Sequence, residues 1–132
     1  MDLIKTIMDM VKIKSETGCV KEVDECLEYI KNNFEGTGAN VLIEHFDDAS
    51  PVIFIRNNND DVQDVMVLGH IDVVKASDDM YEPKIIDGKM YGRGTLDMKA
   101  FAGIAMNSMH YVLANKLKVK FGILLSTDEE KG

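Results

Sequence analysis

Two runs of residues that are apolar on both faces constrain the fold of this chain more than any other feature. One spans residues 65–68 and the other spans residues 119–126, whose middle from Phe121 to Leu125 is almost unbroken in its apolar character. A strand of this kind needs a covering layer on each side. Because helical patterns separate the runs, we expect an α/β fold: a mainly parallel central sheet with helices on both faces, arranged as a three-layer sandwich.

Apolar residues at helical spacing predict three helices. Two amphipathic segments come first, at residues 3–11 and 23–34, and the second meets a stop at residues 36–38 (Gly-Thr-Gly). The third, residues 98–117, is apolar over most of its circumference and should be largely buried. The remaining patterns predict strands at residues 41–46 and 52–56, a hairpin or connecting loop at 57–64 and a small hairpin at 85–91.

Charge and composition exclude several classes of partner. The chain has 132 residues, with 15 basic and 23 acidic side chains, which leaves a formal net charge of −8. Nucleic acid and anionic lipid surfaces are therefore disfavoured, because basic residues are outnumbered and not clustered. No apolar stretch reaches the roughly 18 residues of a membrane span, and the first residues lack a signal-peptide layout. A cytoplasmic protein is expected, with Cys19 and Cys26 as free thiols.

Three clusters of metal-ligating residue types occur. The first, His70 and Asp72, follows the strand predicted at residues 65–68, and in an extended chain an aspartate two positions on points to the same side as the histidine. Asp72 could thus orient His70 as a metal ligand. A purely structural hydrogen bond between the two remains an equal alternative.

The second cluster is Asp97, which a glycine-punctuated turn delivers to the start of the helix predicted at residues 98–117. A carboxylate is stabilised there by the helix dipole and by free amides, so a helix N-cap is the alternative to a ligand role. The third cluster is Asp128, Glu129 and Glu130, directly after the strand predicted at residues 119–126. Adjacent carboxylates repel one another and either share a cation or face solvent.

The three clusters gain weight in combination. In open α/β sheets, sites form at the carboxyl ends of strands, and two of the clusters follow separate predicted strands while the third precedes an intervening helix. One imidazole nitrogen and several carboxylate oxygens suit Zn²⁺ or Mn²⁺ better than Mg²⁺ or Ca²⁺. We therefore expect a transition-metal site at this edge of the sheet.

The residues around these clusters resemble a known family. The strings Leu-Gly-His-Ile-Asp-Val-Val at residues 68–74, Tyr-Gly-Arg-Gly-Thr-Leu-Asp-Met-Lys-Ala-Phe at 91–101 and Ser-Thr-Asp-Glu-Glu-Lys-Gly at 126–132 are similar to three signatures of the co-catalytic zinc deacylases and exopeptidases. That family includes acetylornithine deacetylase, succinyl-diaminopimelate desuccinylase, glutamate carboxypeptidase and aminoacylase. The order and spacing of the strings match, and the leading helices also suit the family's catalytic domain.

The resemblance implies a role for each matched residue. His70 would bind one of two Zn²⁺ ions (or Co²⁺ or Mn²⁺), Asp97 would bridge both, and Glu130 would bind the other. Glu129 would be the general base, and Asp72 would orient His70. The implied reaction is metal-assisted hydrolysis of an amide bond in an N-acyl amino acid or small peptide, in amino-acid metabolism. The other histidines, His45 and His110, match no motif, and we expect structural roles for both.

The resemblance also bears on domain organisation. Family members are typically longer and carry two further metal ligands and a lid or dimerisation domain, so residues 1–132 are expected to be the N-terminal portion of one catalytic domain. Such a portion would bind one metal or none and would be inactive by itself, while a complete form would be compatible with a homodimer. Two alternatives remain: a non-catalytic, truncated homologue that acts as a metal-binding or interaction module, and a chain that pairs with another to complete the sheet.

Overall fold

The central sheet joins segments that are far apart in the sequence. The computed structural model describes residues 1–47 and 50–131. Its four-stranded sheet has the order β1-β2-β6-β3, with bounds β1 Asn40–Glu44, β2 Val52–Arg56, β3 Val65–His70 and β6 Phe121–Ser126. Because β3 and β6 are neighbours, their carboxyl ends meet at one edge of the sheet, with His70 opposite Ser126.

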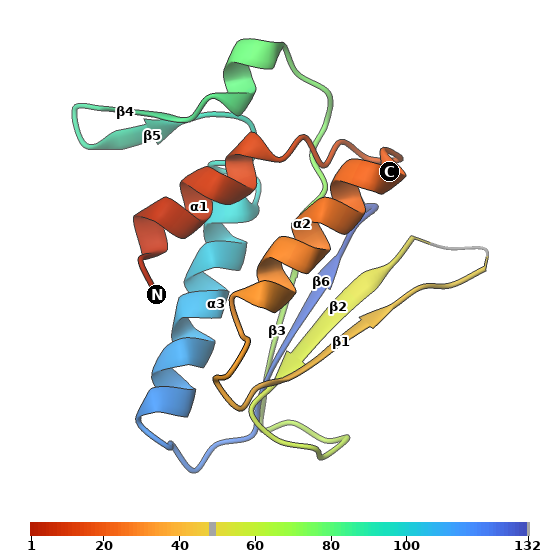
Figure 1. Cartoon of the computed structure of the whole chain (residues 1–132), viewed down its shortest axis with the longest axis vertical. Helices are drawn as coiled ribbons and strands as arrows, with labels where there is room; N and C mark the ends of the chain where they lie inside the picture. Colours follow the sequence, from red (N-terminus) through yellow and green to blue (C-terminus); the bar gives the residue numbers. More distant parts are fainter. Residues whose placement is uncertain (48–49, 132) are drawn as a thin grey trace.

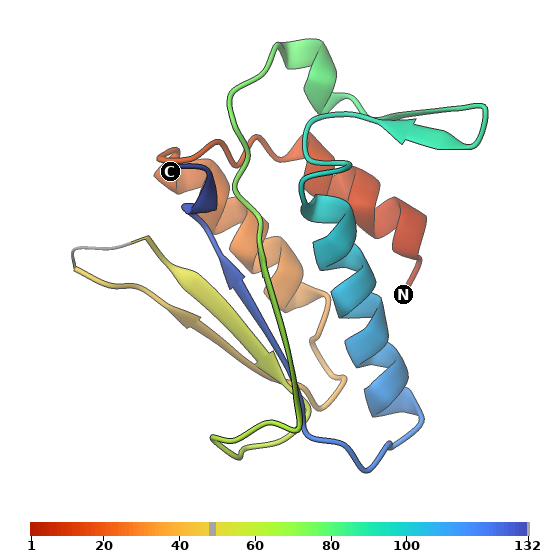
Figure 2. The same ribbon diagram turned by 180° about the vertical axis from the view of Figure 1, so that it is seen from behind.

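Three helices accompany the sheet, close to where the periodicity predicts them: α1 Leu3–Lys12, α2 Val20–Asn32 and α3 Lys99–Ala114. They lie in front of the sheet in Figure 1 and behind it in Figure 2, so all three cover the same face. A separate hairpin, β4 Lys84–Ile86 and β5 Lys89–Tyr91, matches the one predicted at residues 85–91. Asp87 and Gly88 both have positive φ, as a tight two-residue hairpin turn requires.

The α/β class is confirmed, while two details of the expected sheet differ. First, only β3 and β6 are parallel, and β2 is antiparallel to both β1 and β6. The physical reason is the length of the connections: the crossover from β3 to β6 includes α3 and allows parallel pairing, whereas the seven residues between β1 and β2 allow a hairpin.

Second, no helix among the described residues covers the other face of the sheet. The apolar runs do have two apolar faces, as predicted, and Met66 and Leu68 of β3 are 41% and 63% exposed on the uncovered side. Leu42, Phe54 and Leu124 contribute to the same side and line a shallow concavity of about 190 Å³. The described part of the chain is thus a two-layer structure with one bare apolar face.

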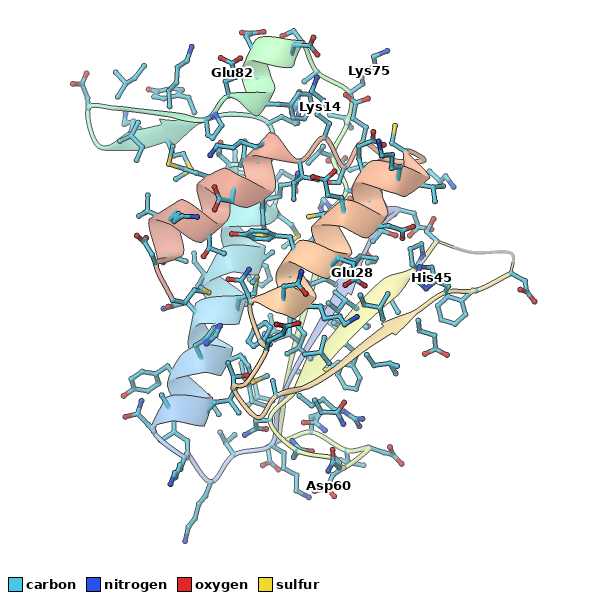
Figure 3. The ribbon with its side chains drawn as sticks, in the orientation of Figure 1. Lys14, Glu28, His45, Asp60, Lys75 and Glu82 are labelled. Carbon is cyan, nitrogen blue, oxygen red and sulfur yellow. The ribbon has the colours of Figure 1, made fainter. Side chains whose placement is uncertain are left out.

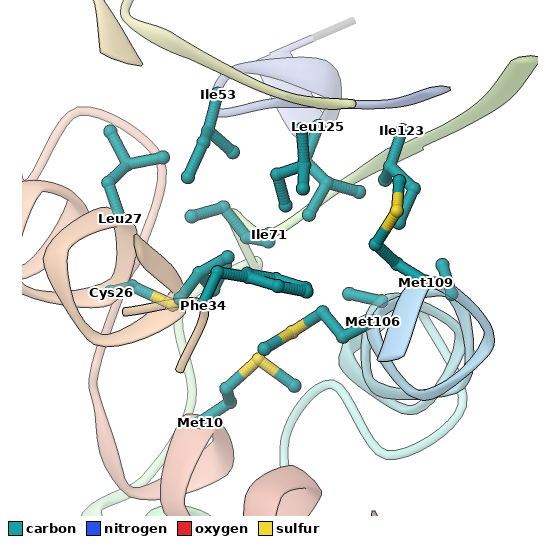
Figure 4. Close-up of a cluster of buried hydrophobic side chains, with 14 of the residues drawn as sticks. Met10, Cys26, Leu27, Phe34, Ile53, Ile71, Met106, Met109, Ile123 and Leu125 are labelled. Atoms are coloured by element: carbon teal, nitrogen blue, oxygen red, sulfur yellow. The ribbon is translucent and has the colours of Figure 1, made fainter. Parts of the chain in front are cut away.

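The hydrophobic core fills the space between the helices and the covered face. Phe34 lies at its centre, with Ile53 and Leu125 from the sheet and Met10 and Met106 from the helices around it (Figure 4). Gly103 lets α1 and α3 approach closely, because a Cβ atom there would lie 2.5 Å from Cγ1 of Ile7. None of the helices among the described residues combines the length and apolar character needed to span a bilayer.

Two short 3-10 helices, η1 Asp78–Tyr81 and η2 Glu129–Lys131, complete the described elements. Two residues separate the second from β6, so it lies at the carboxyl ends of β3 and β6. In Figures 1 and 2 this end lies beside the loop that joins α1 to α2. Three loops far apart in the sequence therefore meet at one edge: residues 13–19, residues 71–77 and the segment after β6.

Candidate metal centre

His70 is the last residue of β3 and is buried. Its Nδ1 lies 3.0 Å from the backbone carbonyl oxygen of Asp72 and 3.2 Å from Oδ1 of the same residue. Because a carbonyl oxygen only accepts, Nδ1 carries the proton and donates it, which leaves Nε2 with a free lone pair in the neutral ring. The local β3 geometry therefore presents one nitrogen of His70 as a ligand atom.

Asp97 faces that nitrogen, with its Oδ1 3.2 Å from His70 Nε2. The turn that delivers it depends on Gly94, which has a φ of +84° and whose Cβ, if present, would lie 3.0 Å from Cγ1 of Val73. The predicted N-cap role for Asp97 is not observed: the cap position of α3 is Met98, and no side chain caps it. The Asp97 side chain remains largely exposed and free to bind a ligand.

Glu129 and Glu130 are held by their backbones. The amide of Glu129 donates to Oδ1 of Asp72 across 3.2 Å, and the amide of Glu130 donates to Oδ2 across 3.1 Å. One carboxylate oxygen of Glu129 lies 3.5 Å from His70 Nε2. Both side chains approach His70 from η2, although 59 positions or more separate them in the sequence.

The electrostatics at this point favour positive charge. Burial by itself lowers the pKa of His70, but the carbonyl and carboxylate of Asp72 and the acidic groups that face Nε2 outweigh it and raise the pKa above its ordinary value. Carboxylates that stabilise an imidazolium ion in this way also stabilise a bound metal cation at the same position.

The donor set fits a divalent transition metal. One ligand atom from each of His70, Glu129 and Glu130 lies within 4.8 Å of the others, which is close enough for a shared ion after small side-chain adjustments. Asp97 stands outside this group of three but contacts His70 directly. An imidazole whose other nitrogen is hydrogen-bonded, together with carboxylates, is the ligand chemistry of zinc and manganese sites.

The structure therefore brings together every residue that the sequence proposed for the site: His70, Asp72, Asp97, Glu129 and Glu130. Gly132, the last residue of the third motif, lies outside the described residues. The carboxylate of Asp128 is the exception within the acidic triplet, because neither the ligand group nor the contacts of His70 include it.

The other two histidines lie elsewhere. His45 contacts Asp24 of α2 across 3.3 Å, and Figure 3 shows it just beyond the end of β1. His110 stacks on Phe34 with ring centroids 4.7 Å apart. Cys19 and Cys26 are free, as expected. These four residues take no part in the cluster around His70.

One residue of the cluster escaped sequence reasoning. The Thr17 hydroxyl donates to Oδ2 of Asp72 across 2.8 Å, the shortest contact that this carboxylate makes. The segment around it, residues 15–18 (Ser-Glu-Thr-Gly), reads in the sequence as an ordinary loop between two helices. No spacing rule links it to Asp72, which lies 55 positions further along.

A concavity of about 580 Å³ lies between β3 and α3, but no residue of the metal-type cluster lines it. Its walls are Val65, Val67, Tyr111 and Val119 with their neighbours. The cluster instead occupies the open edge of the sheet, where Asp97 and Glu129 are accessible from solvent.

The chain is similar to known proteins in sequence and to solved structures in fold. A model of peptidase family M20/M25/M40 matches residues 66–132, the segment that carries all three motifs. A succinyl-diaminopimelate desuccinylase of Rickettsia felis is 30% identical over 141 aligned residues, which cover 96% of this chain and 36% of the relative.

Two solved structures have the same fold. Human carnosine dipeptidase 1 superimposes with a TM-score of 0.81 at 22% identity, over 99% of this chain and 32% of its own. The M20 family metallo-carboxypeptidase Sso-CP2 from Sulfolobus solfataricus gives the same TM-score, identity and coverage. The chain thus spans about a third of the length of the relatives it matches.

Proposed function

Since the chain belongs to peptidase family M20/M25/M40, we propose that it forms the N-terminal portion of the catalytic domain of a metal-dependent hydrolase. The proposed reaction is cleavage of an amide bond in an N-acyl amino acid or a small peptide. The observation that carries the proposal is the convergence of His70, Glu129 and Glu130, whose ligand atoms lie within 4.8 Å of one another. The desuccinylase and dipeptidase names of the relatives agree with this substrate class.

Each residue has a proposed task. With metal bound, His70 and Glu130 would hold it, Asp97 would bridge the two ions that the family resemblance implies, and zinc is the metal we favour. When bound, the metal supplies Lewis acidity, which lowers the pKa of water and polarises a carbonyl group. Asp72 keeps the proton of His70 on Nδ1, because its carbonyl oxygen accepts from that nitrogen.

Glu129 is the proposed general base. Its carboxylate is accessible, lies 3.5 Å from His70 Nε2 and is fixed at the backbone by Asp72, so it can accept a proton from an attacking water and pass it to the leaving amine. Glu130, its neighbour, remains available as a ligand. The division of labour between the two glutamates follows the family resemblance.

The test is Glu129→Gln in the protein as its gene encodes it, with N-succinyl-diaminopimelate and N-acetylornithine as substrates. Turnover should fall by about 10²–10⁴-fold, as removal of a general base predicts, while zinc affinity stays within a few-fold of wild type. The matched control Glu35→Gln, an exposed residue after α2, should change neither. Measurable turnover that Glu129→Gln leaves unchanged would refute Glu129 as the general base, and absence of turnover in the wild type as well would favour a metal-binding or interaction module.

The same proposal includes domain organisation and location. Because the chain covers only 32–36% of the length of its relatives, we propose that residues 1–132 alone hydrolyse these substrates at a negligible rate. We also propose that the complete protein is cytoplasmic and homodimeric. Rapid hydrolysis by the isolated 132-residue chain would refute the first point. Light scattering on the complete protein tests the last.

A further inference from the structure

The loop between α1 and α2 runs alongside the segment that carries His70 and Asp72. Ser15 donates from its hydroxyl to the carbonyl of Ile71 across 2.7 Å, and its own carbonyl accepts from the amide of Val73. The amide of Thr17 then donates to the carbonyl of Val73 across 3.1 Å. Backbone bonds and the Ser15 hydroxyl therefore secure this loop without the hydroxyl of Thr17.

The Thr17 hydroxyl is directed at the Asp72 carboxylate, which is fully buried. Four donors surround the two carboxylate oxygens. Oδ1 faces His70 Nδ1 and the Glu129 amide, and Oδ2 accepts from the Glu130 amide and from Thr17. Three of these donors belong to His70, Glu129 and Glu130. Within the described part of the chain, Thr17 is therefore the one contact that holds the carboxylate without being a proposed ligand or base.

We propose that Thr17 is a positioning residue of the metal centre, acting through Asp72. Its hydroxyl fixes the rotation of the Asp72 carboxylate, and that rotation sets both the His70 ring and the turn that presents Glu129 and Glu130. This inference rests on the proposed function for its catalytic consequence, but the geometry it describes belongs to the folded chain itself.

Loss of the hydroxyl has a definite consequence. In Thr17→Val the shape of the side chain is kept while Oδ2 of Asp72 retains a single donor, so the buried carboxylate rotates towards its remaining partners. The His70 ring and the turn at Glu129 and Glu130 are then no longer held in place by the same fixed carboxylate. Substitution of groups that orient metal ligands typically weakens metal affinity about 10–100-fold, and we expect the lower end, about tenfold, because Thr17 acts through one intermediate.

The experiment compares Thr17→Val and Thr17→Ser in the protein as its gene encodes it. Zinc affinity is measured by competition with a chromophoric chelator, and the His70 ring is followed in the metal-free protein through its ¹⁵N imidazole resonances. Thr17→Val should bind zinc about tenfold more weakly and shift the His70 Nδ1 resonance. Thr17→Ser, which keeps the hydroxyl, should restore both. If Thr17→Val does not fold, Thr17→Ala makes the same comparison.

Ser15→Ala is the matched control, because it removes a hydroxyl from the same loop that is bonded to a backbone carbonyl rather than to Asp72. It should lower the thermal unfolding midpoint and leave both readouts near wild type. Equal effects of Ser15→Ala and Thr17→Val, or wild-type behaviour of Thr17→Val, would overturn the inference. If the wild type binds no zinc, the proposed function fails, whereas the His70 resonance still decides the role of Thr17.

Discussion

Lys99 donates a hydrogen bond from Nζ to the backbone carbonyl of Ile13 across 2.7 Å, although the two residues are 86 positions apart. Nζ also donates to the carbonyl of Met10 across 2.9 Å. These carbonyls lie at the end of α1, and each also accepts one backbone amide, so Lys99 supplies a second donor to both. Burial lowers the pKa of Lys99, and the nearby Asp72 opposes that effect. The side chain thereby ties α1 to the first turn of α3, beside Asp97.

Replacement of Lys99 by Met should destabilise the protein strongly. The variant keeps the apolar stem but removes the charged donor from the carbonyls of Met10 and Ile13, each of which keeps one backbone amide partner. A hydrogen bond to a charged group contributes about 1.5–3 kcal/mol. Urea denaturation measures the loss in the free energy of unfolding. Lys12→Met is the control, since Lys12 forms only an exposed pair with Asp9 and should cost less than about 1 kcal/mol. Equal losses in both variants would contradict the capping role.

Gly103→Ala should also destabilise, although alanine is the better helix former by about 1 kcal/mol. The new Cβ would lie 2.5 Å from Cγ1 of Ile7, and overpacking of this kind costs about 1–3 kcal/mol. The sign should reverse in an Ile7→Ala background, because the clashing atom is gone and the helix propensity of alanine remains. Chemical denaturation of the four proteins of this double-mutant cycle measures the coupling. Additive effects would show that α1 and α3 do not meet at Gly103.

Much of this structure could be predicted from local patterns. Helical spacing placed α1, α2 and α3 within a few residues, and the β-branched run at residues 52–56 coincides with β2. The site residues could be proposed because ligand-type side chains follow predicted strands, and the carboxyl ends of neighbouring parallel strands meet. His70 and Ser126 are opposite each other for this reason.

The remainder depended on contacts that no local pattern encodes. The pairing of β2 with β6 is antiparallel, and the two strands are 69 positions apart at their starts, so periodicity gave no sign of their direction. Lys99 is a charged residue at a helix start, yet it is fully buried. Thr17 reaches Asp72 only because the loop after α1 pairs with the segment after β3. Tertiary packing overrides the preferences of such residues.

Zinc should raise the thermal stability of the protein through the cluster around His70. A ligand that binds the folded state at 100 times its dissociation constant raises the free energy of unfolding by about 2.7 kcal/mol. Differential scanning fluorimetry with and without Zn²⁺ measures the shift, and a chelator should reverse it. His70→Ala should abolish the response, whereas His45→Ala, which changes a surface histidine paired with Asp24, should keep it. An equal shift in both variants would place the zinc elsewhere.

His110 should make stability fall at acid pH. Burial first, and then the positive N-terminus, lower its pKa below the ordinary value of 6.5. As the pH falls, the unfolded chain therefore binds this proton before the folded chain does, so stability present above about pH 6.5 is lost towards the lowered pKa. His110→Phe keeps an aromatic ring on Phe34 and removes the titration. Unfolding midpoints measured from about pH 8 to pH 5 should decline less steeply in the variant than in wild type. The difference between the two midpoints should be constant only at the alkaline end of this range. Parallel curves over the whole range would show that His110 does not contribute to the acid sensitivity.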